Sequence, residues 1–172
     1  MPLAKPRELF VHELSDTMSA EHIVLEMLGA LQQETSNDDV RSAIQHHIGE
    51  TRDQIKILGK IFKQLGEEPE ETTCHAAEGL KKEHEALKDE QPSPMVLEIG
   101  NLVGAAKTEH YEIASYTALV GMAMDLNEPE IAGLLKESLQ QEKDMGRTVE
   151  KLARQVGKEV KAQMKKAANA TA

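Results

Sequence analysis

Apolar residues recur every three to four positions along four long stretches of the chain, at residues 7–34, 37–66, 94–125 and 128–165. This spacing places them on one face of an α-helix, and no alternating pattern indicates a strand. The residues between the stretches are typical of helix ends, with Ser36 or Asn37 as an N-cap, Gly66 after a helix, and Asn127 before a proline. The pattern therefore predicts an all-α fold of four long helices in two hairpins.

A shorter helical segment, at residues 74–89, lies in the connection between the two hairpins. The connection is long enough to cross a bundle from one end to the other. The chain has 172 residues, of which 40% are hydrophobic, so it has the length of one ordinary domain and enough apolar side chains for a core. We expect residues 1–172 to form a single domain.

The two predicted hairpins resemble each other in sequence. Residues 20–31, AEHIVLEMLGAL, align with residues 108–119, TEHYEIASYTAL, which places Glu21 opposite Glu109. The second helices align less well, although Glu50 and Glu142 occupy nearly equivalent positions. A helical hairpin that was duplicated and then diverged accounts for this similarity.

Charge and composition argue against several classes of partner. The formal net charge is −10, and the chain has no Trp, two Phe and two Tyr, so it offers neither a positive field for phosphates nor a surface for base stacking. We expect no nucleic-acid partner. No apolar run is long enough for a signal peptide or a membrane span, which predicts a cytoplasmic protein without membrane association. The single cysteine, Cys74, fits a reducing compartment.

Each long helix points a glutamate toward the interior when it is drawn as a helical wheel. Glu109 lies near the centre of the stripe on the third long helix, with Glu112 at its edge, and Glu142 lies on the stripe of the fourth. Glu21 and Glu50 lie on the shoulders of the first and second stripes. The stripe of the third long helix is expected to run through Met95, Ile99, Leu102, Ala106, Ile113, Thr117, Val120 and Met124.

The same glutamates are expected at one level of the bundle. Residues equidistant from a hairpin turn lie level on antiparallel helices, and the midpoints of 21 and 50 and of 109 and 142 both fall in predicted turns. Four carboxylates in a dry interior are costly to desolvate unless they are protonated or neutralised by cations. Oxygen ligands with some imidazole suit iron or manganese, so the pattern predicts a pair of such ions. A buried, hydrogen-bonded acid network without metal is the alternative.

Several motifs resemble the ferritin-like di-iron carboxylate superfamily and, within it, the bacterial YciE/YciF family of stress-response proteins. The similarity covers nearly the whole chain and lies in ELSDTMSAE, HHIGETRDQIKILGKIFKQLG, TCHAAEGL, KTEHYEIASY and LQQEKD. It implies a ferritin-like four-helix bundle, a homodimer, and a di-iron or dimanganese centre of poorly defined activity. By position, it makes Glu21, Glu50, Glu109 and Glu142 metal ligands, with Glu112 as a second glutamate one turn after Glu109.

The chain departs from the superfamily's Glu-x-x-His pattern, because Asp53 and Met145 stand where the histidines are expected. The wheel turns Asp53 outward, so His47 or Gln54 is the expected further ligand beside Glu50. An ordinary core histidine is an equally good interpretation of His47. The predicted metal ligands are Glu21, His47, Glu50, Gln54, Glu109, Glu112 and Glu142.

The expected function is redox chemistry at two iron or manganese ions in stress protection. Peroxide reduction, or iron oxidation with oxygen, would make peroxide or oxygen the small-molecule substrate. The alternative is a non-catalytic structural or interaction bundle whose acidic core is a remnant. The sequence leaves open whether the protein is an enzyme, which metal it holds, and which molecule donates electrons.

Overall fold

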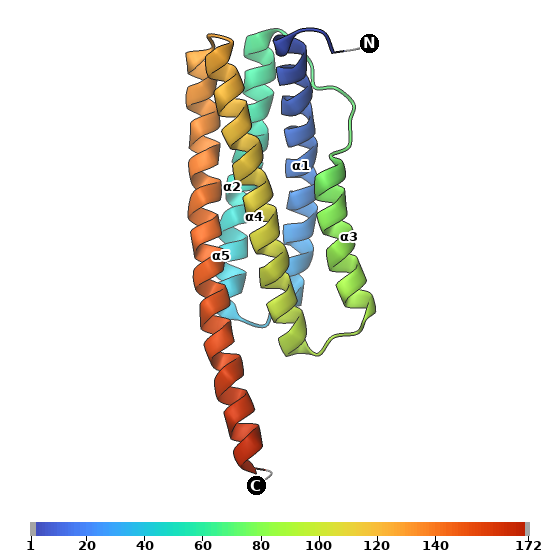
Figure 1. The fold of residues 1–172 in the computed structure, drawn as a ribbon, viewed down its shortest axis with the longest axis vertical. Helices are drawn as coiled ribbons and strands as arrows, with labels where there is room; N and C mark the ends of the chain where they lie inside the picture. Colours follow the sequence, from blue (N-terminus) through green and yellow to red (C-terminus); the bar gives the residue numbers. More distant parts are fainter. Residues whose placement is uncertain (1–2, 171–172) are drawn as a thin grey trace.

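The computed structural model describes residues 3–170 and folds them into five α-helices (Figure 1). α1 (Pro6–Glu34) and α2 (Asp38–Leu65) form the first hairpin, and α4 (Pro94–Asp125) and α5 (Pro129–Ala170) form the second. α3 (His75–Asp89) lies in the connection between them. The predicted all-α architecture is confirmed, with a short fifth helix in the crossover. No helix among these residues is both long enough and apolar enough to cross a membrane.

The four long helices pack side by side into one bundle. α1 contacts α2, and α4 contacts α5, within the two hairpins. The hairpins join where α1 packs on α4 and α2 packs on α5. α3 lies outside this bundle and packs on α1 and α4, as the green helix of Figure 1 shows. The crossover therefore covers one side of the bundle and leaves the interior to the long helices.

Helix ends follow the turn chemistry expected from the sequence. The N-cap of α2 is Asn37, whose side-chain oxygen accepts hydrogen bonds from the backbone N–H groups of Asp39 at 3.0 Å and Val40 at 3.2 Å. Gly66 ends α2 at a φ of 69°, a left-handed conformation that glycine adopts without steric cost. These two residues give α2 a defined beginning and a defined end.

Cys74 is the N-cap of α3 and is 1% exposed. Its Sγ accepts a hydrogen bond from the backbone N–H of Ala77 and lies 2.9 Å from the hydroxyl of Tyr111. Burial raises the pKa of the thiol above its usual value, which keeps it protonated. The cysteine therefore serves as a small buried residue where α3 begins.

Two apolar clusters lie toward opposite ends of the bundle. The larger contains Phe10, Leu14, Leu58, Leu119 and Leu135, and the smaller contains Val40, Leu102, Leu152 and Val156. Along each long helix the residues between these clusters include buried polar side chains. The interior therefore has apolar ends and a polar layer near its middle, which is where the candidate site lies.

The buried face of α4 differs from the predicted stripe. Met95 and Ile99 are each 38% exposed and Met124 is 52% exposed, whereas Glu112 and Tyr116 are buried. Apolar residues occur nearly all round this helix, so their periodicity alone leaves its rotation undefined. Partners on α1, α2 and α5 turn the acidic side of α4 inward instead.

α5 continues to Ala170, beyond the predicted end near residue 165. Its last turns extend past the other helices (Figure 1), and the side chains of residues 161–166 are exposed. Ala, Lys and Gln, which dominate this segment, have high intrinsic helix propensity. The helix therefore persists where packing against the bundle has ended.

Candidate metal centre

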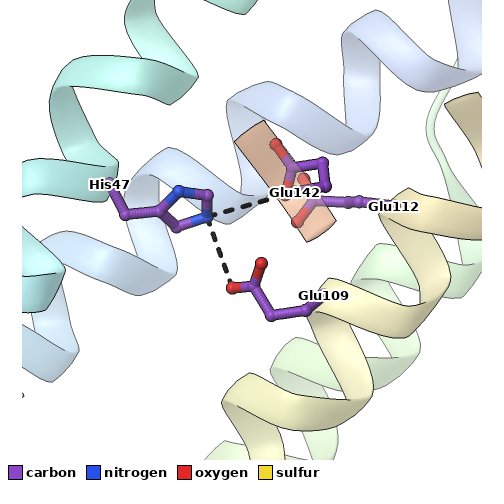
Figure 2. A group of neighbouring side chains, drawn as sticks. All are labelled: His47, Glu109, Glu112 and Glu142. Carbon is purple, nitrogen blue, oxygen red and sulfur yellow. Dashed lines mark ion pairs between the residues drawn. The ribbon is translucent and has the colours of Figure 1, made fainter. Parts of the chain in front are cut away.

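Four side chains converge near the middle of the bundle: His47 from α2, Glu109 and Glu112 from α4, and Glu142 from α5 (Figure 2). Each offers one ligand atom, and these atoms all lie within 4.8 Å of one another. Their exposed fractions are 2%, 3%, 2% and 0% in the same order. The group is therefore compact, shielded from solvent, and composed of residue types that bind metal ions.

Helix geometry brings these side chains together. Glu109 and Glu112 are three positions apart on α4, so they lie on the same side of that helix, one turn from each other. His47 reaches them from α2 and Glu142 from α5, because α2 packs on α5 and α5 packs on α4. Three helices therefore contribute to one cluster.

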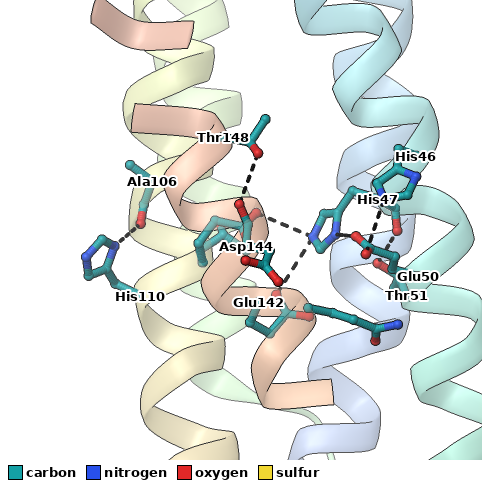
Figure 3. A network of polar contacts seen from close by, with 12 residues as sticks. His46, His47, Glu50, Thr51, Ala106, His110, Glu142, Asp144 and Thr148 are labelled. Carbon is teal, nitrogen blue, oxygen red and sulfur yellow. Dashed lines mark hydrogen bonds and ion pairs between the residues drawn. The ribbon is translucent and has the colours of Figure 1, made fainter. Parts of the chain in front are cut away.

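The imidazole of His47 is held on both sides. Its Nδ1 lies 3.4 Å from Glu50 Oε2 (Figure 3). Its Nε2 lies 3.4 Å from Glu109 Oε1 and 3.9 Å from Glu142 Oε2 (Figure 2). Metal-binding histidines commonly use one ring nitrogen for the ion and the other for an orienting carboxylate. Glu50, whose side chain is 17% exposed, thus orients the histidine from the solvent side.

Glu21 and Gln54 flank the group from α1 and α2, and both are fully buried. The hydroxyl of Tyr116 donates a hydrogen bond to Glu21 Oε1 at 2.5 Å. Gln54 Nε2 donates to Glu142 Oε1 and, at 3.1 Å, to Gln141 Oε1. All seven predicted ligands therefore lie in one region: four in the group, and Glu21, Glu50 and Gln54 around it.

Many of the potential metal-ligand atoms in this region have no hydrogen-bond partner. Among residues 3–170, nine buried side-chain nitrogen or oxygen atoms lack a hydrogen-bond partner, and seven of them belong to the predicted ligands. Native interiors contain few such atoms, and each costs about 1–3 kcal/mol. A cation between them would satisfy them, and their chemistry fits iron or manganese. The seven atoms are Glu21 Oε2, His47 Nε2, Gln54 Oε1, Glu109 Oε2, Glu112 Oε1 and Oε2, and Glu142 Oε2.

Burial changes the protonation of the acids. Desolvation, together with the charge of Glu142, raises the pKa of both Glu21 and Glu109 to about 8, and it raises the pKa of Glu112 well above its usual value. Burial alone lowers the pKa of His47, but the hydrogen bond to Glu50 and the nearby carboxylates raise it to about 9. At neutral pH the cluster therefore retains protons, which a bound cation would displace.

Neither of the two departures from the superfamily pattern supplies a residue to the four-residue group. Asp53 is exposed and pairs with Lys56 at 2.7 Å, whereas Met145 is an apolar, buried side chain. His47, one turn before Glu50, supplies the imidazole in their place. Sequence reasoning missed the contact between Tyr116 and Glu21, although the position of Tyr116 one turn after Glu112 was a signal for it.

Comparison with known proteins identifies close relatives. The family model described as "Domain of unknown function (DUF892)" matches residues 5–164. Over 137 residues the chain is 35% identical to "Protein YciF" of Escherichia coli (strain K12), covering 79% of this chain and 82% of that protein. The crystal structure of the E. coli stress protein YciF has a TM-score of 0.87 at 32% identity, covering 91% of this chain and 99% of that one.

Two further solved structures share the fold. YcfI from Rhodopseudomonas palustris has a TM-score of 0.83 at 30% identity, covering 86% of this chain and 94% of that chain. A ferritin-like, diiron-carboxylate protein from Bacillus anthracis str. Ames has a TM-score of 0.67 at 14% identity, covering 88% and 99% of the two chains. At that identity the likeness concerns the fold alone, which is ferritin-like.

Proposed function

The chain belongs to the DUF892 family and to the ferritin-like proteins related to YciF, and on this basis we propose that it binds two iron or manganese ions for redox chemistry in stress protection. The observation that carries the proposal is the set of seven buried oxygen and nitrogen atoms of the predicted ligands that have no hydrogen-bond partner. They gather around His47, Glu109, Glu112 and Glu142, which lie within reach of a common cation.

In this proposal the four converging residues hold the centre, and Glu21, Glu50 and Gln54 complete the ligand set from its edges. Two such ions supply, when bound, the electron transfer needed to reduce peroxide or to oxidise iron with oxygen. Peroxide or oxygen is the proposed small-molecule substrate. The carboxylates match the preference of both metals for oxygen ligands.

Hydrogen bonds between the ligands and their neighbours hold the site in position, and the surrounding apolar residues exclude water. Glu50 holds the outer nitrogen of His47, Tyr116 donates to Glu21, and Gln54 donates to Glu142. The apolar clusters on either side keep the polar layer dry, which strengthens every electrostatic interaction within it. Loss of such a supporting contact commonly weakens metal binding about 10- to 100-fold.

A non-catalytic structural role is the second candidate. YcfI of Rhodopseudomonas palustris is described as a structural protein, and it shares 30% identity with this chain. In that case the acids would remain protonated in the interior, with no ion between them.

We also propose a cytoplasmic homodimer, which the family resemblance implies, and light scattering of the purified protein tests its mass.

Metal content separates the two candidates. Protein purified without chelator is expected to carry iron or manganese in amounts approaching two ions per chain, measured by inductively coupled plasma mass spectrometry. The loaded protein is expected to consume hydrogen peroxide in the presence of a reductant. Metal below about a tenth of an equivalent after loading, with no peroxide consumption, would favour the structural role.

A further inference from the structure

The outer side of α5 carries a continuous row of basic side chains. Exposed positions follow one another at steps of three or four residues from 136 to 165, and all but Gln140 are Lys or Arg. Such steps keep side chains on one face of a helix, within about 40° of a straight line. This row, hereafter the basic stripe, consists of Lys136, Lys143, Arg147, Lys151, Arg154, Lys158, Lys161 and Lys165.

The basic stripe faces solvent along its whole length. The buried residues of α5, among them Leu135, Met145 and Val156, lie on the opposite face of the helix. At a rise of about 1.5 Å per residue, the stripe is about 44 Å long from Lys136 to Lys165. Its final part belongs to the turns of α5 that extend past the other helices (Figure 1). The stripe is therefore accessible to a long partner.

Acidic side chains neutralise little of this charge. Arg147 pairs with Asp144, and Arg154 pairs with Glu150 at 3.6 Å. Within the part of the chain that the structure describes, the side chains of the six lysines in the stripe form no ion pair. Residues 143–166 contain eight basic and three acidic residues, a net charge of +5 in a chain whose total is −10. This charge is available to an external anion.

The acidic residues concentrate on the other side of the molecule. Residues 67–90, which include α3, contain nine acidic and three basic residues. α3 packs on α1 and α4 and lies across the bundle from α5 (Figure 1). The total charge, from which we expected no nucleic-acid partner, is therefore an average over one strongly positive face and one strongly negative face.

The residue types on α5 discriminate between anionic partners. Protein interfaces are depleted of lysine and enriched in aromatic side chains, and helices that bind membrane surfaces present an apolar face beside the basic one. Among the described residues of α5, Met164 is the only exposed large apolar side chain, and the helix has no aromatic residue on which single-stranded bases could stack. The phosphates of double-stranded DNA require neither feature.

Part of the basic stripe also has a shape that suits phosphate groups. Lys151, Arg154 and Lys158 surround an open hollow together with Gln155. Lysine and arginine form short, charge-assisted hydrogen bonds to phosphate oxygens. Each strand of double-stranded DNA carries one phosphate about every 3.4 Å along the axis, so a stripe of about 44 Å lies along about 13 base pairs.

We propose that the basic stripe of α5 binds the phosphate backbone of double-stranded DNA without sequence preference. Its lysines and arginines contact phosphate oxygens, and such contacts carry no information about the base sequence. The acidic crossover faces away from the bound DNA. This binding requires no metal ion, so it goes beyond the proposed redox function.

Fluorescence anisotropy of a labelled DNA duplex, titrated with the purified protein, tests the proposal. With a duplex of about 30 base pairs in about 50 mM NaCl, we expect saturable binding with a Kd on the order of 10 μM. Raising the salt to about 200 mM is expected to weaken binding at least about 20-fold, because phosphate contacts release counterions. A single strand of the same length should bind more weakly than the duplex, since α5 offers no stacking surface.

A triple variant removes the cations around the hollow: Lys151→Gln, Arg154→Gln and Lys158→Gln. We expect its affinity for the duplex to fall by more than about tenfold, and the slope of log K against log salt to become shallower by about two to three. All three side chains are exposed, so the melting temperature measured by circular dichroism should match that of the wild type.

The matched control is a triple variant on α2: Lys56→Gln, Lys60→Gln and Lys63→Gln. These lysines are exposed and similarly spaced, and their replacement changes the net charge by the same amount. Because they lie outside the basic stripe, we expect the affinity to stay within about threefold of the wild type.

Three results would overturn the proposal. They are the absence of saturable duplex binding, equal losses of affinity in the two triple variants, and tighter binding to vesicles rich in phosphatidylglycerol than to the duplex. The last result would assign the basic stripe to an acidic lipid surface instead. The readout is equilibrium binding, so it does not depend on whether the protein holds a metal.

Discussion

Glu142 is the most enclosed acid of the candidate metal centre, with an exposed fraction of 0%. Its Oε1 accepts from Gln54, and its Oε2 has no hydrogen-bond partner. A carboxylate in this position can bind a cation, but it destabilises a metal-free bundle, because burying a charge without a partner of opposite charge is costly. The same residue should therefore have opposite effects on metal binding and on the stability of the metal-free protein.

Replacing Glu142 with Gln keeps the shape of the side chain and removes its charge. We expect affinity for manganese to fall by at least about tenfold, because a ligand is lost. The metal-free variant is expected to be more stable than the metal-free wild type by about 1 kcal/mol, since one fewer acid is desolvated. Manganese titration and urea unfolding measure the two effects. Glu137→Gln, at an exposed position on the same helix, should change neither.

Tyr116 has a supporting role that can be separated from metal binding. Tyr116→Phe leaves Glu21 without its hydrogen-bond donor in a buried place, and we expect a loss of about 1–3 kcal/mol in the free energy of unfolding. Urea denaturation measures this loss. Tyr111→Phe, on the same helix and only half buried, should cost less. A Tyr116→Phe protein as stable as the wild type would show that the contact contributes nothing.

The crossover helix α3 is attached to the bundle through polar contacts as well as apolar ones. Glu34 of α1 pairs with Lys88 Nζ at 2.7 Å and with His84 Nε2 at 3.1 Å, both on α3. Gly100 of α4 allows close packing at the same end of α3, because a Cβ there would overlap the side chain of Leu87. These contacts hold α3 against α1 and α4.

The attachment of α3 should weaken in acid. Burial raises the pKa of Glu34, but the hydrogen bond from Lys88 and the charge of His84 outweigh it, so the pKa lies below the usual 4.5. An acid whose pKa is lower in the folded state contributes stability above its unfolded pKa and loses it as the pH falls through the folded value. We therefore expect Glu34→Gln to cost about 1 kcal/mol at pH 7 and progressively less below pH 4.5.

Urea unfolding of wild type and variant across this pH range measures the difference. Glu26→Gln is the matched control, because Glu26 also pairs with α3, through Lys81 at 2.9 Å, but its side chain is 69% exposed. Solvent screens such a pair, so this change should have little effect at any pH. A cost for Glu34→Gln that stays constant from neutral to acid pH would rule out the ion pairs as its cause.

In the bundle as a whole, the polar layer is the part of the interior that we expect to lower the stability of the metal-free protein. His47, Glu109, Glu112 and Glu142 come from three of the four long helices, and their packing places the layer between two apolar clusters. A cation bound there would connect helices of both hairpins. The stability of the entire fold should then depend on metal.

Manganese added to metal-free protein is expected to raise the melting temperature, with a gain of about 2.7 kcal/mol when the free ion reaches about 100 times its Kd. Circular dichroism at increasing manganese concentration measures the shift. A variant with Gln at positions 109, 112 and 142 should show no comparable shift at the same concentrations. An equal shift in this variant would place the stabilising ion elsewhere.

Local sequence patterns were sufficient to predict the helices, the hairpins and the level of the four glutamates in the bundle. Helical periodicity and caps such as Asn37 depend on neighbouring residues, and the rise per residue of a helix is constant. Heights along antiparallel helices can therefore be counted from the turn, which placed Glu21 with Glu50 and Glu109 with Glu142. Their role as ligands stays a prediction.

Contacts between segments that are far apart in the sequence determined the features that local patterns did not predict. The rotation of α4 that exposes Met95 and buries Tyr116 depends on α1 and α5, because apolar residues surround that helix and define no single face. The direction of His47 Nε2 depends on Glu50 and Glu109 together, and the unpaired oxygen of Asn101 depends on Glu34 and on the position of α3. Periodicity along one helix contains no information about such partners, so only the packed bundle could reveal them.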